Sequence, residues 1–210
     1  MFITLEGIEG SGKTTLIDYI VKFLNRKGVS YLTTREPGGT LIGSQIRTIL
    51  LAPDNRALSP VAELLLYVAD RTHHLETCVK PALDEGKIVI CDRYYDATMV
   101  YQGFARGLDT NMIAQLHALC CENLMPDMTF LLDLPPEIGL KRAWKQINNG
   151  NRNLTETRFE NETLNFHRKV REGYLQLAQN EPDRFFVIDA KQDIDNVCEI
   201  VANTLSFLID

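Results

Sequence analysis

A glycine-rich segment near the start of the chain constrains its fold more than any other feature. Residues 7–14 read Gly-Ile-Glu-Gly-Ser-Gly-Lys-Thr, a complete G-x-x-x-x-G-K-[ST] spacing. The apolar run at residues 2–5 predicts a buried strand, and the apolar periodicity from Leu16 to Leu24 predicts a helix. Strand, glycine loop and helix therefore follow one another in the order that a phosphate-binding turn requires.

The chemistry of this turn predicts that the chain binds a nucleoside triphosphate. Glycines allow successive backbone N–H groups to surround a phosphate, and the helix N-terminus adds its positive end. Lys13 would reach the β and γ phosphates, and the Thr14 hydroxyl would ligate Mg²⁺. The predicted contacts with the triphosphate are Gly7, Ile8, Glu9, Gly10, Ser11, Gly12, Lys13, Thr14 and Thr15.

Bulk properties indicate an ordinary globular enzyme. We expect the 210 residues to form a single domain over positions 1–210, since 45% are hydrophobic and 24% charged. A formal net charge of −6 argues against a nucleic-acid polymer as partner, although not against a nucleotide. No apolar run reaches membrane-spanning length and the first strand starts at once, so we expect a cytoplasmic location without a membrane or signal peptide.

The five cysteines and four histidines suggest no metal or redox centre. No C-x-x-C pair occurs, and cysteines in such a chain are expected to be small buried hydrophobes. His73 and His74 would point to different sides of a helix, so their pattern does not suggest a zinc site.

Predicted strands and helices alternate along the chain. Strands are expected at residues 2–5, 30–34, 87–91, 128–134 and 184–188. Helices are expected at residues 13–27, 40–51, 60–84, 111–124, 136–145, 158–179 and 193–208, with Pro81 kinking or ending the third. This α/β pattern predicts a five-stranded parallel sheet with helices on both faces and ligands at the carboxyl ends of the strands.

The stretch at residues 146–157 is polar, rich in asparagine and almost without apolar anchors. Composition alone indicates a surface loop. Because Arg142 precedes it and Arg158 follows it, the same segment, at about residues 142–158, could also act as a mobile lid over a phosphate site. The two interpretations are compatible.

Two further segments narrow the choice among nucleotide-binding proteins. A GTPase would offer an Asn-Lys-x-Asp tetrapeptide, and the chain has none. The second predicted strand runs into Arg35-Glu36-Pro37-Gly38-Gly39-Thr40, and the third runs into Asp92-Arg93-Tyr94, with Tyr101-Gln102-Gly103 following. Together with the glycine loop, these segments closely resemble those of the thymidylate kinase family. The resemblance extends over essentially the whole chain.

The resemblance implies a P-loop nucleoside monophosphate kinase fold with a lid, and a reaction in which ATP and Mg²⁺ convert dTMP to dTDP for dTTP synthesis. It assigns catalysis to Lys13, Arg93 and a lid arginine, and metal binding to Thr14 and Asp92. A structural ion pair is the alternative for Arg93. Since the loop carries Gly10 where some relatives have arginine, the chain resembles the bacterial-type, lid-arginine class. Arg152 is our first candidate for the lid arginine and Arg142 the second.

The resemblance also implies an acceptor pocket formed by Glu9, Glu36, Arg47, Tyr67, Arg71, Arg93, Tyr101 and Gln102. Tyr67 would stack on thymine, Arg71 and Gln102 would hydrogen-bond its edge, and Tyr101 would lie beneath the sugar. Without the resemblance, Tyr67 reads as core packing, Arg47 as a solvated helix arginine and Glu9 as an exposed loop residue. Family members are commonly homodimers. A kinase with another nucleotide acceptor and a non-catalytic nucleotide-binding switch remain the alternatives.

Overall fold

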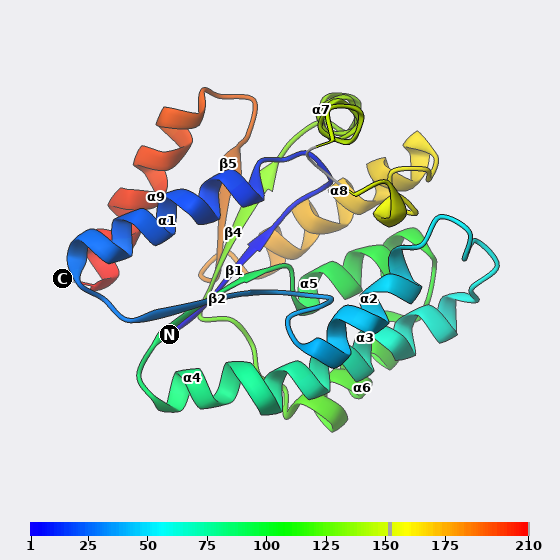
Figure 1. Cartoon of the computed structure of the whole chain (residues 1–210), viewed down its shortest axis with the longest axis horizontal. Helices are drawn as coiled ribbons and strands as arrows, with labels where there is room; N and C mark the ends of the chain where they lie inside the picture. The colour runs from blue at the N-terminus through cyan, green and yellow to red at the C-terminus, as the bar shows by residue number, and fades with distance from the viewer. Residues whose placement is uncertain (151–152, 210) are drawn as a thin grey trace.

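Five parallel strands form the centre of the computed structural model, which describes residues 1–150 and 153–209 (Figure 1). Their spatial order is β2 (Tyr31–Arg35), β3 (Ile88–Asp92), β1 (Phe2–Glu6), β4 (Met128–Asp133) and β5 (Phe185–Asp189). Every neighbouring pair is parallel. The predicted α/β fold with a five-stranded parallel sheet is confirmed, and each observed strand starts within one residue of its predicted position.

Helices connect the strands. The first half of the chain contributes α1 (Lys13–Lys27), α2 (Leu41–Leu51), α3 (Pro60–His74), the π-helical turn η1 (Leu75–Val79), α4 (Lys80–Asp84), α5 (Tyr95–Thr98) and the π-helical η2 (Met99–Ala105). The second half contributes α6 (Thr110–Cys121), α7 (Pro136–Asn148), the 3-10 turn η3 (Leu154–Glu156), α8 (Leu164–Asn180) and α9 (Ile194–Ile209).

Alternating side chains of the central strands build a separate hydrophobic cluster on each face of the sheet. Ile3 and Ile90 belong to the cluster that contains Leu16 and Ile20 of α1, whereas Val89 belongs to the one with Leu64 and Val68 of α3. Figure 1 shows α1 beside α9 and away from α3 and α4. This period of two follows from the strand pleat, and it leaves the ends of the strands as the place where polar groups gather.

The predicted helix at 60–84 differs from the observed one near its middle. Its winding widens to a π turn over Leu75–Val79 and then continues through Pro81 to Asp84. Proline lacks an N–H and its ring clashes with a regular helix interior, so an irregular turn before it is the physical accommodation. Proline therefore does not end the helix at once.

The prediction that a helix begins at residue 158 is wrong, because α8 begins at Leu164. Thr163 caps its N-terminus, with the side-chain oxygen accepting from the Phe166 N–H at 3.2 Å. Arg158 instead donates its backbone N–H to Leu51 O at 3.2 Å. A tertiary contact therefore overrides helical propensity over residues 158–163, which keeps these side chains near the cavity described below.

The helical segment formed by α5 and η2 was not predicted. It follows β3 directly and contacts α8. π-helical turns are rare and are often found at functional sites. Here the turn η2 carries Tyr101 and Gln102, two of the residues assigned to the acceptor pocket.

Two observations on the described part of the chain bear on other classes of protein. None of its helices combines the length and apolar character needed to cross a membrane. Cys91, Cys121 and Cys198 are buried as expected, whereas Cys78 and Cys120 are only half-buried.

Candidate functional site

A cavity of about 590 Å³ opens at the carboxyl ends of β1, β2 and β3. The glycine loop after β1 forms its floor, Glu36 and Pro37 follow β2, and Asp92 and Arg93 mark the end of β3. Its remaining lining comes from α2, α3, α5, η2, Gln146 of α7 and the segment around η3. The cavity therefore lies where a parallel α/β sheet is expected to bind its ligand.

The glycine loop is held in a conformation that only glycine adopts freely. Gly10 has a φ of 71°, and a Cβ there would collide with the Gly139 carbonyl of α7. Gly7 has a φ of 135°, and a Cβ there would lie 2.6 Å from the Leu132 carbonyl. Positive φ and close backbone approach together disfavour any side chain at Gly7 and Gly10.

The Lys13 ammonium lies inside the loop. Its Nζ donates to Gly7 O at 2.9 Å, to Ile8 O at 3.0 Å and to Ser11 Oγ at 3.4 Å. Burial, and then the nearby Arg93 charge, lower the pKa of Lys13 to about 8. The positively charged Lys13 side chain is thus held by two backbone carbonyls and one hydroxyl of the loop.

Arg93 reaches into the cavity from a strained backbone. Its φ is 68°, an uncommon value for a residue with a side chain. Its Nη1 donates to Gly7 O at 2.8 Å and to the Tyr174 hydroxyl at 3.3 Å, and its Nη2 donates to Glu9 Oε1 at 3.1 Å. The guanidinium is therefore fixed in place by the loop it faces.

Glu6, at the end of β1, contacts two neighbours of Arg93. Its Oε1 accepts the Tyr94 N–H at 2.8 Å, and its Oε2 accepts the Tyr174 hydroxyl at 2.6 Å. The carboxyl thus holds both the residue after Arg93 and the tyrosine that Arg93 contacts. Burial, and then the negative charge of Asp96, raise the pKa of Glu6 to about 8.

Glu9 is not an exposed loop residue, since only 7% of its surface is accessible. Its Oε1 accepts the Tyr101 hydroxyl at 2.6 Å, and its Oε2 lies 3.2 Å from His167 Nδ1 without hydrogen-bond geometry. Burial opposes ionisation, but the His167 contact and the Arg93 charge hold the pKa of Glu9 well below its usual range. Glu9 is therefore an anion that orients both Arg93 and Tyr101.

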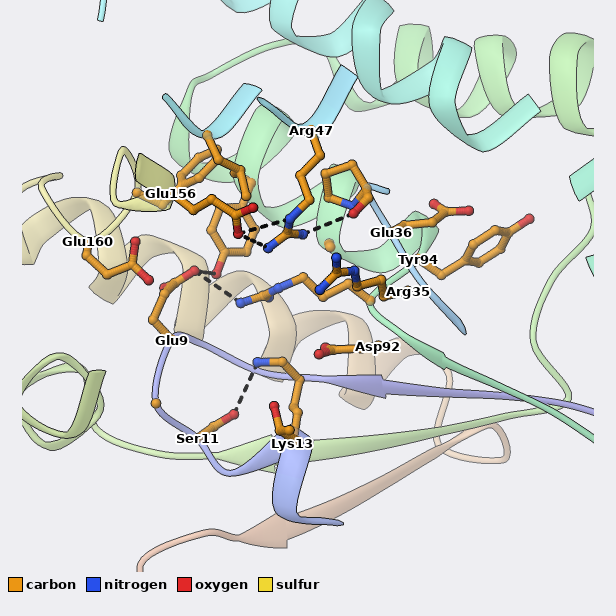
Figure 2. A pocket seen from close by; sticks show the side chains of 18 of the residues that line it. Glu9, Ser11, Lys13, Arg35, Glu36, Arg47, Asp92, Tyr94, Glu156 and Glu160 are labelled. Atoms are coloured by element: carbon orange, nitrogen blue, oxygen red, sulfur yellow. Dashed lines mark hydrogen bonds and ion pairs between the residues drawn. The ribbon is translucent and has the colours of Figure 1, made fainter. Parts of the chain in front are cut away.

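Asp92 and Thr14 present oxygen atoms suited to a hard cation. Asp92 Oδ1 is buried and has no hydrogen-bond partner among residues 1–150 and 153–209. Figure 2 shows the Asp92 carboxylate beside Lys13, and Thr14 lines the same cavity. An unsatisfied carboxylate oxygen and a hydroxyl fit Mg²⁺, which completes its shell with phosphate oxygens and water. No cluster of three or more His, Cys, Asp or Glu ligands exists in the described residues, so an all-protein metal cage is not formed there.

Arg47 of α2 lies on the opposite side of the cavity and is paired with η3. Its Nε and Nη2 donate to Glu156 Oε2 at 3.1 and 2.7 Å, and its Nη1 donates to Pro37 O at 3.0 Å (Figure 2). Arg47 is thus held across the cavity rather than solvated. The segment predicted as a lid therefore contributes an acid, Glu156, to this site.

A buried arginine closes the far end of the cavity. Arg71 of α3 is 2% exposed, and its Nε donates to Glu36 Oε2 at 2.8 Å. Its Nη2 donates to Tyr94 O at 3.1 Å and to Thr98 Oγ1 at 2.7 Å. Within residues 1–150 and 153–209, Nη1 has no hydrogen-bond partner, and Tyr67 lines the cavity one helical turn away.

Gln102 completes this end. Its Nε2 donates to Glu63 Oε1 at 2.6 Å, and the side chain lines the cavity. Glu63 in turn accepts Arg158 Nη2 at 2.5 Å on its other oxygen. The amide of Gln102 is therefore held by a carboxylate behind it.

The cavity brings together most of the residues singled out from the sequence. Its lining includes Glu9, Gly10, Ser11, Gly12, Lys13, Thr14, Thr15, Glu36, Arg47, Tyr67, Arg71, Asp92, Arg93, Tyr101 and Gln102. Gly7 and Ile8 contribute the carbonyls that Lys13 contacts. Arg152 lies outside the described residues.

Arg142 does not line this cavity. Its Nη1 donates to Ala190 O at 3.1 Å, and it lines a second cavity of about 630 Å³ on the other side of the glycine loop. Lys191 and Lys145 line the same space, next to Gly12 and Thr15. Ala190 and Lys191, directly after β5, therefore border the glycine loop on this side.

Sequence reasoning missed four acidic or aromatic partners: Glu63, Glu156, Glu160 and Tyr174. The Glu160 side chain lines the cavity and lies near Glu9 in Figure 2. The sequence offers little to distinguish the four missed residues. Glu156 and Glu160 lie within or next to a polar stretch that is typical of a surface loop. Glu63 reads as an ordinary acidic residue in the first turn of a helix.

The family is decided by comparison with known proteins. The thymidylate kinase family model matches residues 5–201. The chain belongs to the thymidylate kinase family. A thymidylate kinase of Desulfosudis oleivorans is 55% identical over 190 residues, which cover 90% of this chain and 89% of the relative. One of Syntrophotalea carbinolica is 54% identical over 205 residues, covering 98% and 94%. The crystal structure of thymidylate kinase from Ehrlichia chaffeensis superposes with a TM-score of 0.75 at 34% identity and covers 98% of both chains.

The environment of Glu6 generates a prediction about pH. Its folded-state pKa is raised from 4.5 to about 8, so the folded protein holds a proton that the unfolded chain releases. This contribution to stability is fully present below about pH 4.5 and is lost as the pH rises through about 8. Glu6→Gln cannot ionise; its Oε1 can still accept the Tyr94 N–H, and its amino group can donate to the Tyr174 oxygen. Between pH 5 and 8 the free energy of unfolding of the parent should fall by at least ~1 kcal/mol more than that of Glu6→Gln. Urea unfolding at several pH values measures this, and identical slopes would show that Glu6 is ionised in the folded protein.

Proposed function

We propose that the chain transfers the γ-phosphoryl group of ATP to dTMP, giving ADP and dTDP, with Mg²⁺ as the metal cofactor. The observation that carries the proposal is the position of Arg93, between the glycine loop and the cavity that holds Arg47 and Arg71. A phosphate-binding loop alone would suit any nucleotide-binding protein. A second set of arginines opposite the loop is what an acceptor phosphate and base require.

The proposed mechanism uses positioning and charge rather than a protein base. The attacking oxygen belongs to a phosphate whose second pKa is ~6, so it is largely ionised at neutral pH. Lys13 lies within the loop that would hold the donor phosphates, and Arg93 lies where its fork would bridge donor and acceptor. Fixed cations at these points offset the repulsion between two anions and stabilise the charge of the transferring group.

Asp92 and Thr14 would hold Mg²⁺, which supplies charge neutralisation to the donor phosphates when bound. Asp92 Oδ1 supports this assignment, because it is buried and has no hydrogen-bond partner among the described residues. The donor base would occupy the second cavity beside Arg142 and Lys191. Of the two lid arginines, Arg142 lies on the donor side with its Nη1 on Ala190 O, so we keep Arg152 as the first candidate for contact with the transferring phosphate.

The acceptor would lie between Arg47 and Arg71. Arg47 would bind the phosphate, Tyr67 would stack on the base, and Arg71 Nη1 would donate to a base carbonyl. Tyr101 is 5% exposed and fixed by Glu9, so it would form a rigid wall beneath the sugar that leaves little space for a 2′-hydroxyl. A 5-methyl group contributes only ~1–3 kcal/mol in an apolar pocket, so preference over dUMP is expected to be moderate.

A homodimer and a cytoplasmic location remain proposals. The support for a dimer is a set of exposed apolar side chains on the neighbouring helices α2, α3 and α6: Leu41, Ile42, Ile49, Val61, Leu65 and Leu119. Exposed apolar groups of this kind are typical of protein interfaces.

The decisive assay is ADP formation from ATP and Mg²⁺ with dTMP, dUMP, UMP, CMP, AMP and GMP offered separately. We expect strong turnover with dTMP, weaker turnover with dUMP and little with the ribonucleotides. Preference for another acceptor would keep the kinase fold and replace the base assignments. Hydrolysis that does not depend on an acceptor would instead favour a nucleotide-binding switch.

Replacing Arg93 tests its role between the two phosphates. Arg93→Ala should lower kcat by about 10²–10³-fold, the typical effect of removing one preorganised charge donor. ATP affinity, measured by calorimetry, should change by no more than about threefold, because Lys13 and the loop amides remain. Near-normal turnover would remove Arg93 from the mechanism.

The Arg47–Glu156 pair predicts competition between the protein's own carboxylate and the acceptor phosphate. In Glu156→Gln the competing charge is removed, so KM for dTMP should fall roughly two- to fivefold, as expected for a partly exposed ion pair of ~0.5–1 kcal/mol. Glu137→Gln, on α7, breaks an exposed pair with Arg168 of α8 and serves as the control, with KM unchanged. A rise in KM for Glu156→Gln would mean that Glu156 orients Arg47 for the phosphate instead of competing with it.

A further inference from the structure

Glu63 of α3 is a buried carboxylate just behind the cavity. It is 1% exposed, and each of its oxygens has a strong donor: Gln102 Nε2 lies 2.6 Å from Oε1, and Arg158 Nη2 lies 2.5 Å from Oε2. Arg106 Nε approaches Oε1 at 3.4 Å. The Gln102 amino group and both guanidinium groups are donors, so the two Glu63 oxygens act as acceptors in every one of these contacts.

This one-way chemistry fixes the orientation of the Gln102 amide. A glutamine has a donor end and an acceptor end, and rotation by 180° about its last bond exchanges them. The Gln102 amino group now lies 2.6 Å from Glu63 Oε1. Rotation would put the Gln102 carbonyl oxygen at about that distance from Oε1, and two buried acceptor oxygens facing each other are unfavourable. The amino group of Gln102 therefore faces Glu63, and its carbonyl oxygen faces the cavity.

The surroundings hold Glu63 itself in place. Arg158 Nε donates to Leu50 O at 2.5 Å, which ties the guanidinium to the end of α2. Arg106 also pairs with Glu162 at 2.6 Å and lies over the Phe166 ring. Gln102 is 1% exposed, so water is not available to satisfy a rotated amide. Neither member of the Glu63–Gln102 pair can reorient at low cost.

We infer that Glu63 is a specificity-determining positioning residue, which selects pyrimidine bases that carry hydrogen on N3. The inference rests on the proposed function, in which Gln102 contacts the acceptor base. Thymine N3–H donates to the Gln102 carbonyl oxygen. The N3 of cytosine is an acceptor and meets that oxygen with a second lone pair, which leaves both groups unsatisfied. Arg71 is a second filter, because its guanidinium would face the exocyclic amine of cytosine.

The test compares dTMP with dCMP in Glu63→Gln. A glutamine at 63 can donate or accept, so the Gln102 amide becomes free to rotate and accept either base. We expect the ratio of kcat/KM for dTMP to that for dCMP to fall roughly tenfold or more, while kcat/KM for dTMP falls only about twofold. The remaining preference reflects Arg71. A purely structural role for Glu63 would instead lower both substrates' kcat/KM together and leave the ratio unchanged, which would overturn the inference.

Arg106→Met is the matched control, because it removes a partner of the same carboxylate but leaves the carboxylate in place. Its selectivity ratio should equal that of the parent, and an equal fall in both variants would overturn the inference. If Glu63→Gln does not purify folded, Glu63→Gln with Arg158→Met removes the guanidinium left unpaired, and the same fall is expected. A parent enzyme that is inactive with dTMP would refute the proposed function itself, whereas an active parent with an unchanged ratio refutes only the role of Glu63.

Discussion

The ion pair between Arg93 and Glu9 is the interaction on which the cavity depends. Glu9 belongs to the glycine loop after β1, and Arg93 follows β3 in a strained conformation. The parallel pairing of β1 with β3 sets Leu5 opposite Asp92, and the Arg93 N–H donates to Leu5 O at 3.0 Å. The sheet register therefore brings a cation to the edge of a phosphate-binding loop. Glu9 then fixes that cation and also Tyr101, so one carboxylate organises both halves of the cavity.

Pairing of an arginine with a carboxylate, as in Arg93–Glu9, occurs at several other places around the cavity. Arg71 pairs with Glu36 and Arg158 with Glu63 in buried contacts, whereas the Arg47–Glu156 pair is partly exposed. Burying a charge is unfavourable unless it is paired and hydrogen-bonded, so each partner is needed to keep its arginine in place. This arrangement explains how a chain with a formal net charge of −6 can present a cluster of cations in one cavity. The carboxylates also differ in their contacts: Glu36 pairs with an arginine, Glu63 accepts from the Gln102 amide as well, and Glu156 pairs with the arginine that we propose binds the acceptor phosphate.

Sequence reasoning was most successful where function is encoded in consecutive residues. The glycine spacing with Lys13 and the apolar runs predicted the loop, the strands and their order, because local geometry decides them. Contacts between residues far apart in the sequence could not be predicted in this way. Glu63 meets Gln102 across 39 positions, and Arg47 meets Glu156 across 109. Nothing in either acid's neighbourhood marks it, since only the folded sheet and helices bring the pairs together. The predicted start of α8 at residue 158 was wrong for the same reason, because tertiary contacts of Arg158 override helix propensity.

The central claim is that one cavity system holds two nucleotides at once, with Arg93 between their phosphates. Calorimetric titration with an adenosine and a thymidine joined 5′ to 5′ through a chain of five phosphates tests it most directly. If both sites are filled together, the linked molecule should bind about 10²-fold or more tightly than either ATP or dTMP alone, since the second contact becomes intramolecular. Arg93→Ala should remove most of that gain. Binding no tighter than that of ATP would contradict the account, because it would mean that the donor and acceptor sites do not face each other across Arg93.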